Sequence, residues 1–153
     1  MLAADRNTVE IYTFTITLPL YSRLACNHEW ERVIEIPETS SLYGLHSYIQ
    51  KIVEFDNDHM YLFFAGRSHT NRKIQYNDSA ENPFDSGGYG NVLLNEVYPI
   101  KGLKLYYIFD FGDNWVFEIR RSREKKIAQE NRQYPRVIEH TGDNPDQYKD
   151  WAC

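Results

Sequence analysis

Two aspartates three positions apart, Asp110 and Asp113, are the residues of this sequence with the clearest chemical potential. Carboxylate oxygens on the two sides of a tight turn could hold a divalent cation, because hard cations prefer oxygen ligands. Four side chains elsewhere in the sequence could complete such a site: Glu139, His140, His46 and His59. The alternative is that both carboxylates accept backbone N–H groups and fix the turn. The alternative is favoured, because no second acidic pair stands at the spacing of metal ligands.

His46 and His59 fall near opposite ends of a predicted helix of about 13 residues, which spans roughly 20 Å. They are therefore not expected to share one metal ion, and each is expected to be a half-buried residue with a hydrogen-bonded ring. HExxH and CxxC motifs are absent, which argues against an ordinary zinc site. Acyl-transfer chemistry is disfavoured because Ser86 lacks a nucleophile-elbow context and nothing in the sequence orients Cys26.

A basic run stands further along the chain and consists of Arg120, Arg121, Arg123, Lys125 and Lys126. Such a run could contact a protein partner or the phosphates of a nucleic acid, with nearby Tyr and Trp rings for base stacking. Solvated charge at the end of a strand is the commoner explanation. The formal net charge of −5 also argues against non-specific binding to nucleic acid or to an anionic membrane over the whole surface.

The composition indicates a single domain in a reducing cytoplasm. A chain of 153 residues is long enough to bury one core without covalent staples. The two cysteines, Cys26 and Cys153, are not expected to pair, since there is no secretory context. The first ten residues contain no apolar signal segment, and no apolar run approaches the roughly 20 residues that a membrane span needs.

The stretch that carries both aspartates, YYIFDFGDNWVFEI at 106–119, predicts a β-hairpin in the middle of a sheet. Its two apolar runs are rich in aromatic residues, which favour strands and supply a large buried area. Gly112 in the turn is expected to take a positive φ, which glycine adopts without steric cost. The hairpin would consist of strands at 103–110 and 115–121.

An amphipathic helix is predicted from Leu42 to Ile52, because apolar residues recur there at helical spacing, and Ser40 or Ser41 is its expected N-cap. Further strands are expected at 12–18, 30–36, 60–65 and 134–140. Residues 92–98 are expected to dock, with one helical turn. Residues 66–91 form a long polar loop with a short strand near 73–76, and residues 1–8 and 141–153 are expected to be peripheral.

Together these elements predict a single α+β domain over residues 1–153. Its sheet is expected to be mixed but mainly antiparallel, covered by one main helix in a β-grasp-like plan. That likeness concerns the fold and indicates no function.

Three stretches resemble the plasmid pRiA4b ORF-3-like family: SLYGLHSYIQKIVEFDNDHMYLF, LYYIFDFGDNWVFEI and YPRVIEHTGDNPDQYKDW. The resemblance covers about Tyr12 to Trp151 and implies an α+β fold and an association with plasmids and mobile elements, but no mechanism. Many members carry a Cys and a Pro-Pro-Glu-Asp run in the third stretch, where this chain has Asn144-Pro145-Asp146-Gln147. A function that needs a thiol there is therefore not expected.

Two hypotheses for the function follow. The first is a binding or interaction module without catalysis or cofactor. Its recognition surface would be formed by nine residues: Asp110, Gly112, Asp113, Trp115, Tyr134, Arg136, Glu139, His140 and Trp151. The second is a metal-dependent hydrolase or nuclease-like enzyme that uses Asp110, Asp113, Glu139 and His140 as ligands and base.

Overall fold

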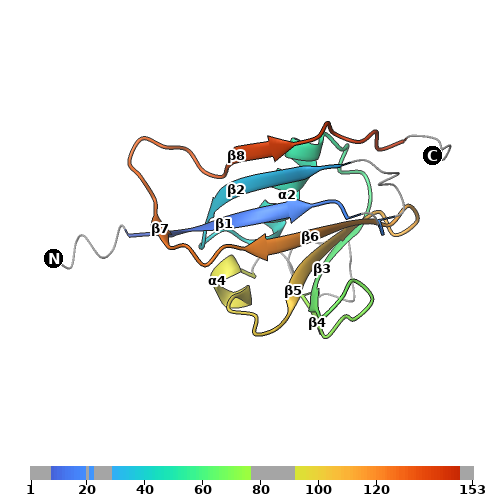
Figure 1. The fold of residues 1–153 in the computed structure, drawn as a ribbon, viewed down its shortest axis with the longest axis horizontal. Helices are drawn as coiled ribbons and strands as arrows, with labels where there is room; N and C mark the ends of the chain where they lie inside the picture. Colours follow the sequence, from blue (N-terminus) through green and yellow to red (C-terminus); the bar gives the residue numbers. More distant parts are fainter. Residues whose placement is uncertain (1–7, 20, 23–28, 77–91, 149–153) are drawn as a thin grey trace.

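The structure is a computed structural model that describes residues 8–19, 21–22, 29–76 and 92–148. Within these residues the chain order begins with β1 (Glu10–Thr17), β2 (Glu31–Pro37), α2 (Leu42–Val53), β3 (Tyr61–Gly66) and β4 (Ile74–Gln75). It continues with α4 (Leu94–Val97), β5 (Lys104–Phe109), β6 (Trp115–Arg121), β7 (Lys126–Ile127) and β8 (Arg136–Thr141), as Figure 1 shows. The predicted strands, the main helix and the helical turn are thus present.

The described strands form one sheet in the order β4-β3-β5-β6-β1-β2-β8, and β7 pairs with β1 beyond the end of β6. Every described pairing is antiparallel. The mainly antiparallel character is therefore confirmed, whereas the predicted mixed sheet is not what these strands form, because each neighbour in the sheet runs in the opposite direction. The β-grasp-like plan stays a prediction.

The β5–β6 hairpin occupies the middle of the sheet, as predicted. Tyr107, Phe109 and Phe117 are fully buried, and Tyr107 lies opposite Phe117 in the pairing register. Burying a large apolar side chain stabilises a fold by about 1.5–3 kcal/mol. Tyr107, Phe109 and Phe117 share one face of the hairpin, and Tyr106 and Ile108, which face the other way, are also buried, so the hairpin is covered on both sides.

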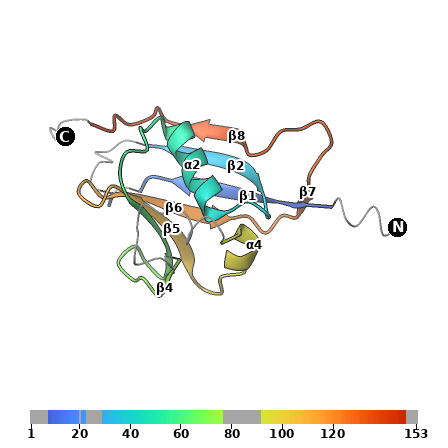
Figure 2. The ribbon, with the colours of Figure 1, turned by 180° about the vertical axis from the view of Figure 1, so that it is seen from behind.

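Helix α2 covers one face of the sheet, and Figure 2 shows it lying across the strands. The N-cap is Ser41, whose hydroxyl oxygen accepts a hydrogen bond from the Gly44 N–H at 3.0 Å. The apolar stripe predicted from helical spacing is buried, including Leu42, Leu45 and Ile49. The helix ends at Glu54, which has a left-handed φ of 61°.

The segment before β5 is held against the start of α2. The N–H of Leu42 donates to the Val92 carbonyl at 2.8 Å, and the Leu94 N–H donates to the Ser40 carbonyl at 2.8 Å. Helix α4 follows directly and buries Leu94 and Val97. These contacts explain why residues 92–98 dock as one helical turn, and they fix where the chain enters β5.

Three local features differ from the sequence prediction or were missed by it. Gly112 does not have a positive φ, and the left-handed positions of the turn are instead Asp110 (φ 63°) and Asn114 (φ 60°). Asp and Asn tolerate this conformation because their short polar side chains bond locally. Strand β7 (Lys126–Ile127) was not predicted, and neither was the bulge at Ile138 in the β2–β8 pairing.

Candidate functional site

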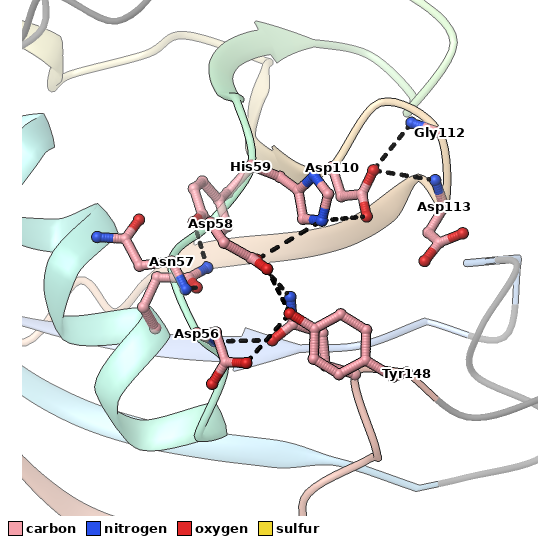
Figure 3. Close-up of polar contacts among 11 residues, drawn as sticks. Asp56, Asn57, Asp58, His59, Asp110, Gly112, Asp113 and Tyr148 are labelled. Carbon is pink, nitrogen blue, oxygen red and sulfur yellow. Dashed lines mark hydrogen bonds and ion pairs between the residues drawn. The ribbon is translucent and has the colours of Figure 1, made fainter.

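The turn between β5 and β6, called here the hairpin corner (residues 110–114), is organised by the carboxylate of Asp110. Its Oδ1 accepts hydrogen bonds from the backbone N–H groups of Gly112 at 3.1 Å and Asp113 at 3.3 Å. A left-handed Asp110 brings its carboxylate over these amides. For Asp110, the alternative interpretation of the sequence, an aspartate that fixes its own turn, is therefore the arrangement found. In Figure 3 the Asp113 carboxylate points away from that of Asp110.

The loop after α2 lies beside the hairpin corner (Figure 3). The His59 ring nitrogen Nε2 is 3.4 Å from Asp110 Oδ2 and 3.6 Å from Asp58 Oδ1. The His59 side chain is 40% exposed, so solvent screens these contacts and each contributes little to stability. Their effect is to hold two segments, 56–59 and 110–114, next to one another at one end of the sheet.

The chain after β8 is fastened to the same loop. The side-chain amide of Gln147 donates to Asp58 Oδ1 at 2.9 Å, and its carbonyl oxygen accepts from the Asp56 N–H at 2.7 Å. The Tyr148 hydroxyl lies within hydrogen-bond distance of the carboxylates of Asp56 and Asp58. The hydrogen bond from Tyr148 to Asp58 lowers the pKa of the Asp58 carboxyl group. Three segments distant in sequence thus form one surface at the hairpin corner.

The nine residues of the predicted recognition surface do not lie together. Asp110, Gly112 and Asp113 form the hairpin corner, but Trp115 is 1% exposed and packs against Phe55 with ring centroids 4.8 Å apart. Trp115 is therefore a core residue, because it begins β6 on the face that α2 covers.

Four further members of the predicted surface belong to the β8 region or precede it. Arg136 lies at the opposite end of β8 from the corner and donates to the buried Glu35 at 2.9 Å. The Tyr134 hydroxyl accepts from the Gln129 N–H at 3.3 Å. Glu139 and His140 are exposed in β8, opposite Val33 and Arg32. The ninth member, Trp151, lies outside the described residues.

The ligand set of the enzyme hypothesis is divided in the same way. Asp110 and Asp113 are at the hairpin corner, whereas Glu139 and His140 stand on the edge strand β8, with β6, β1 and β2 between them in the sheet. In the part of the chain that the structure describes, no group of three or more His, Cys, Asp or Glu side chains is arranged to hold a metal ion.

A buried polar network, called here the Tyr107 network, was not recognised from the sequence. The Tyr107 hydroxyl accepts from the Gln50 amide at 2.9 Å and lies 2.6 Å from His46 Nδ1. His46 Nε2 is 2.7 Å from the Asn57 side-chain oxygen, and the Asn57 N–H donates to Gln50 Oε1 at 3.0 Å. The signal was present, since positions 46 and 50 fall one helical turn apart on the buried stripe.

His46 is more buried than the sequence predicted. Its ring is 2% exposed and stacks on Tyr61 with centroids 3.6 Å apart, and burial lowers its pKa to about 4. We assign the proton of the neutral ring to Nε2, because that nitrogen faces the Asn57 side-chain oxygen, which can only accept; Nδ1 then accepts from the Tyr107 hydroxyl. The expected hydrogen-bonded ring is thus confirmed for this residue, in a structural network.

At the other end of the hairpin, the chain leaves a cavity of about 380 Å³ between residues 98–105 and residues 119–123. Five of the residues that line it are basic: Lys101, Lys104, Arg120, Arg121 and Arg123. We call it the basic pocket. Because β5 is six residues long, the basic pocket and the hairpin corner lie roughly 20 Å apart along the hairpin. In Figure 1 the corner is at the right-hand end of the sheet and α4, which leads into the pocket, is at the lower left.

The basic side chains of the pocket differ in how they are held. Lys104 and Arg120 approach the same carboxylate oxygen of Glu118, at 3.4 Å and 3.8 Å. The Arg121 guanidinium lies over the rings of Tyr12 and Tyr98, 4.9 Å and 5.0 Å from their centroids. Such cation–π contacts position a guanidinium without neutralising its charge.

The basic run that the sequence singled out is only partly a unit. Arg120, Arg121 and Arg123 line the basic pocket, and Lys125 is exposed outside its lining. Lys126 also lies outside the lining, and its Nζ is 2.9 Å from Glu35. Lys101 and Lys104, which sequence spacing did not connect with this run, complete the pocket from the segment that leads into β5.

The fold and these sites define a small α+β protein with one antiparallel sheet and one main helix in its described residues. The match to a family model over residues 10–148 goes further: the chain belongs to the plasmid pRiA4b ORF-3-like protein family. The resemblance read from the three sequence stretches is thereby confirmed.

A solved structure with a similar fold is that of a protein of unknown function, MM3350, from Methanosarcina mazei Go1. The TM-score is 0.67 at 19% sequence identity, over 86% of this chain and 70% of that one, which supports the α+β assignment. No curated protein matches the chain. None of the helices in the described ranges has the length and apolar character needed to cross a bilayer.

Proposed function

We propose that this protein is a non-catalytic binding module that takes an anionic ligand in the basic pocket. The observation that carries the proposal is the gathering of five of the chain's 17 Lys and Arg residues around one cavity, although the net charge is −5. Like charges that share a cavity repel one another, and a bound anion relieves that repulsion.

The charge balance of the pocket supports an anionic ligand. Among the described residues, Glu118 is the carboxylate within ion-pair distance of the lining, and it is shared by Lys104 and Arg120. Lys101 and Arg123 are exposed and make no ion pair with any described residue. Arg121 is positioned by two aromatic rings and keeps its charge. Three cations are thus available to an incoming anion.

The hairpin corner is the second surface that we propose for recognition. The exposed ring of Tyr148 stands there beside the carboxylates of Asp56 and Asp58, and the exposed Phe111 belongs to the hairpin corner itself. Aromatic residues are enriched in protein-binding surfaces, whose rims are polar. Asp110 and Gly112 would shape this surface from below, and a partner would meet the neighbouring side chains. The family description refers to a plasmid, and we propose that this chain also derives from a plasmid or mobile element.

Phosphorus-31 NMR with inorganic pyrophosphate and a short DNA oligonucleotide tests the proposal directly. Binding of at least one of the two probes is expected to broaden or shift its phosphate signals at 50 mM NaCl, and both probes are expected to remain intact after incubation with Mg²⁺, Mn²⁺ or Zn²⁺. Cleavage of a probe would favour the hydrolase hypothesis instead. If neither phosphate-bearing probe bound at low salt, the proposal that the basic pocket takes an anionic ligand would be wrong.

A further inference from the structure

We infer that the ligand of the basic pocket is a small compound with at least two negative charges, of the size and chemistry of pyrophosphate or a nucleotide phosphate chain. This inference rests on the proposed function, because it names the class of anion that the same pocket takes. It excludes a nucleic-acid strand as the main ligand.

The dimensions of the pocket favour a small ligand. A volume of about 380 Å³ lies at the lower end of the range for small-molecule sites, which is roughly 300–1,000 Å³. The cations stand around this one cavity and come from two chain segments, 98–105 and 119–123. A duplex or a long single strand needs a charged groove that follows the backbone over several nucleotides.

The aromatic residues near the pocket are already engaged. Proteins that bind single strands without sequence preference use free aromatic faces, on which successive bases stack. Tyr98 lines the pocket, but its ring is packed edge-on against Tyr12 at 5.7 Å and tilted against Phe14 at 5.6 Å. The Arg121 guanidinium lies over the same ring. The pocket therefore offers cations to a phosphate group and no ring to a base.

The charge of the remaining surface points the same way. A long polyanion would extend beyond the pocket onto a protein with a net charge of −5, and it would be repelled there. A small dianion meets only the local cations. Lys101 and Arg123 belong to the two separate lining segments, so a ligand in the pocket lies between segments that each carry an exposed cation.

Isothermal titration of the full chain with pyrophosphate, a single-stranded 20-mer and a 20-base-pair duplex tests the inference at matched ionic strength. The test variant is Lys101→Glu combined with Arg123→Glu, two exposed residues that form no ion pair with any described residue. The matched control is Lys125→Glu combined with Arg67→Glu, which changes the net charge equally at exposed positions outside the lining. Thermal melts verify that both variants fold.

Pyrophosphate is expected to bind the wild-type chain. Its affinity is expected to fall about tenfold or more in the test variant and to be nearly unchanged in the control variant. If only the oligonucleotides bind, and the test variant abolishes that binding, the small-anion inference is wrong while the proposed function stands. If no probe binds, or if the two variants weaken pyrophosphate binding equally, both the small-anion inference and the proposal that the basic pocket binds an anion are wrong.

Discussion

Acid is expected to destabilise the fold through one residue, His46. In the native protein burial lowers the pKa of its ring to about 4, whereas a histidine in an unfolded chain has a pKa near 6.5. The unfolded chain therefore binds one more proton between these two values. Stability from this residue is fully present above pH 6.5 and is lost as the pH falls towards 4. The shift corresponds to about 3 kcal/mol, a large part of a typical stability of about 5–15 kcal/mol.

Urea unfolding at pH 7.5 and pH 4.5, followed by tryptophan fluorescence, measures how much His46 contributes to the pH dependence of the free energy of unfolding. The wild-type chain is compared with His46→Gln. Carboxylates titrate in both proteins, so the difference between their pH dependences isolates His46. The variant is expected to be less stable at pH 7.5 and to lose about 3 kcal/mol less on acidification. The same comparison with His140→Gln, an exposed histidine on β8, is the control and should show almost no difference. Equal pH dependence of the wild-type chain and His46→Gln would refute a buried neutral His46.

Four further substitutions test the fold by urea unfolding at pH 7.5. Tyr107→Phe removes the hydroxyl at the centre of the Tyr107 network and should cost about 1–3 kcal/mol, because two buried partners lose their bond; a neutral result would mean that the network is not formed. Gly142→Ala should cost at least about 3 kcal/mol, because its φ is 80° and the new Cβ would lie 1.7 Å from a backbone carbonyl oxygen. Gly102→Ala, with a φ of 69° and open space around it, should cost only about 1 kcal/mol, and equal losses would contradict the clash. Glu35→Gln should cost about 2 kcal/mol, less than the roughly 3–5 kcal/mol for a fully buried pair, since both cationic partners are partly exposed; no change would show that the pair contributes nothing.

The elements that could be predicted from the sequence are those with a strong local period. The apolar stripe from Leu42 to Ile52 fits only a helix, and the alternation of apolar and polar residues at 12–18 fits only a strand, because in each case the apolar face must meet a core. Ser41 was among the two expected caps for the same local reason. Strand β7 was missed because two residues, Lys126 and Ile127, carry no period, and only the partner strand β1 makes them extended.

The sites were harder to predict, because they depend on which segments the sheet brings together. Asp110 and Asp113 could be recognised as neighbours because only three positions separate them in the chain. Placing Glu139 and His140 in the same site required the strand order, which the sequence does not show. Trp115 looked like a surface residue because it follows a polar turn, and the side of the sheet that it faces decides its burial. Lys101 and Lys104 are separated in sequence from Arg123 and meet it only through the hairpin pairing.

The strand β8 closes one side of the described sheet, and its form bears on how copies of this protein behave when they are concentrated. An open strand border invites a second molecule to continue the ladder, which is a route to filaments. Here the bulge at Ile138 interrupts the regular spacing of amide groups, and Glu139 and His140 point into solvent beside it. A neighbour that tried to extend the ladder would have to match an irregular border and desolvate charge, so the native molecule resists self-association along this side.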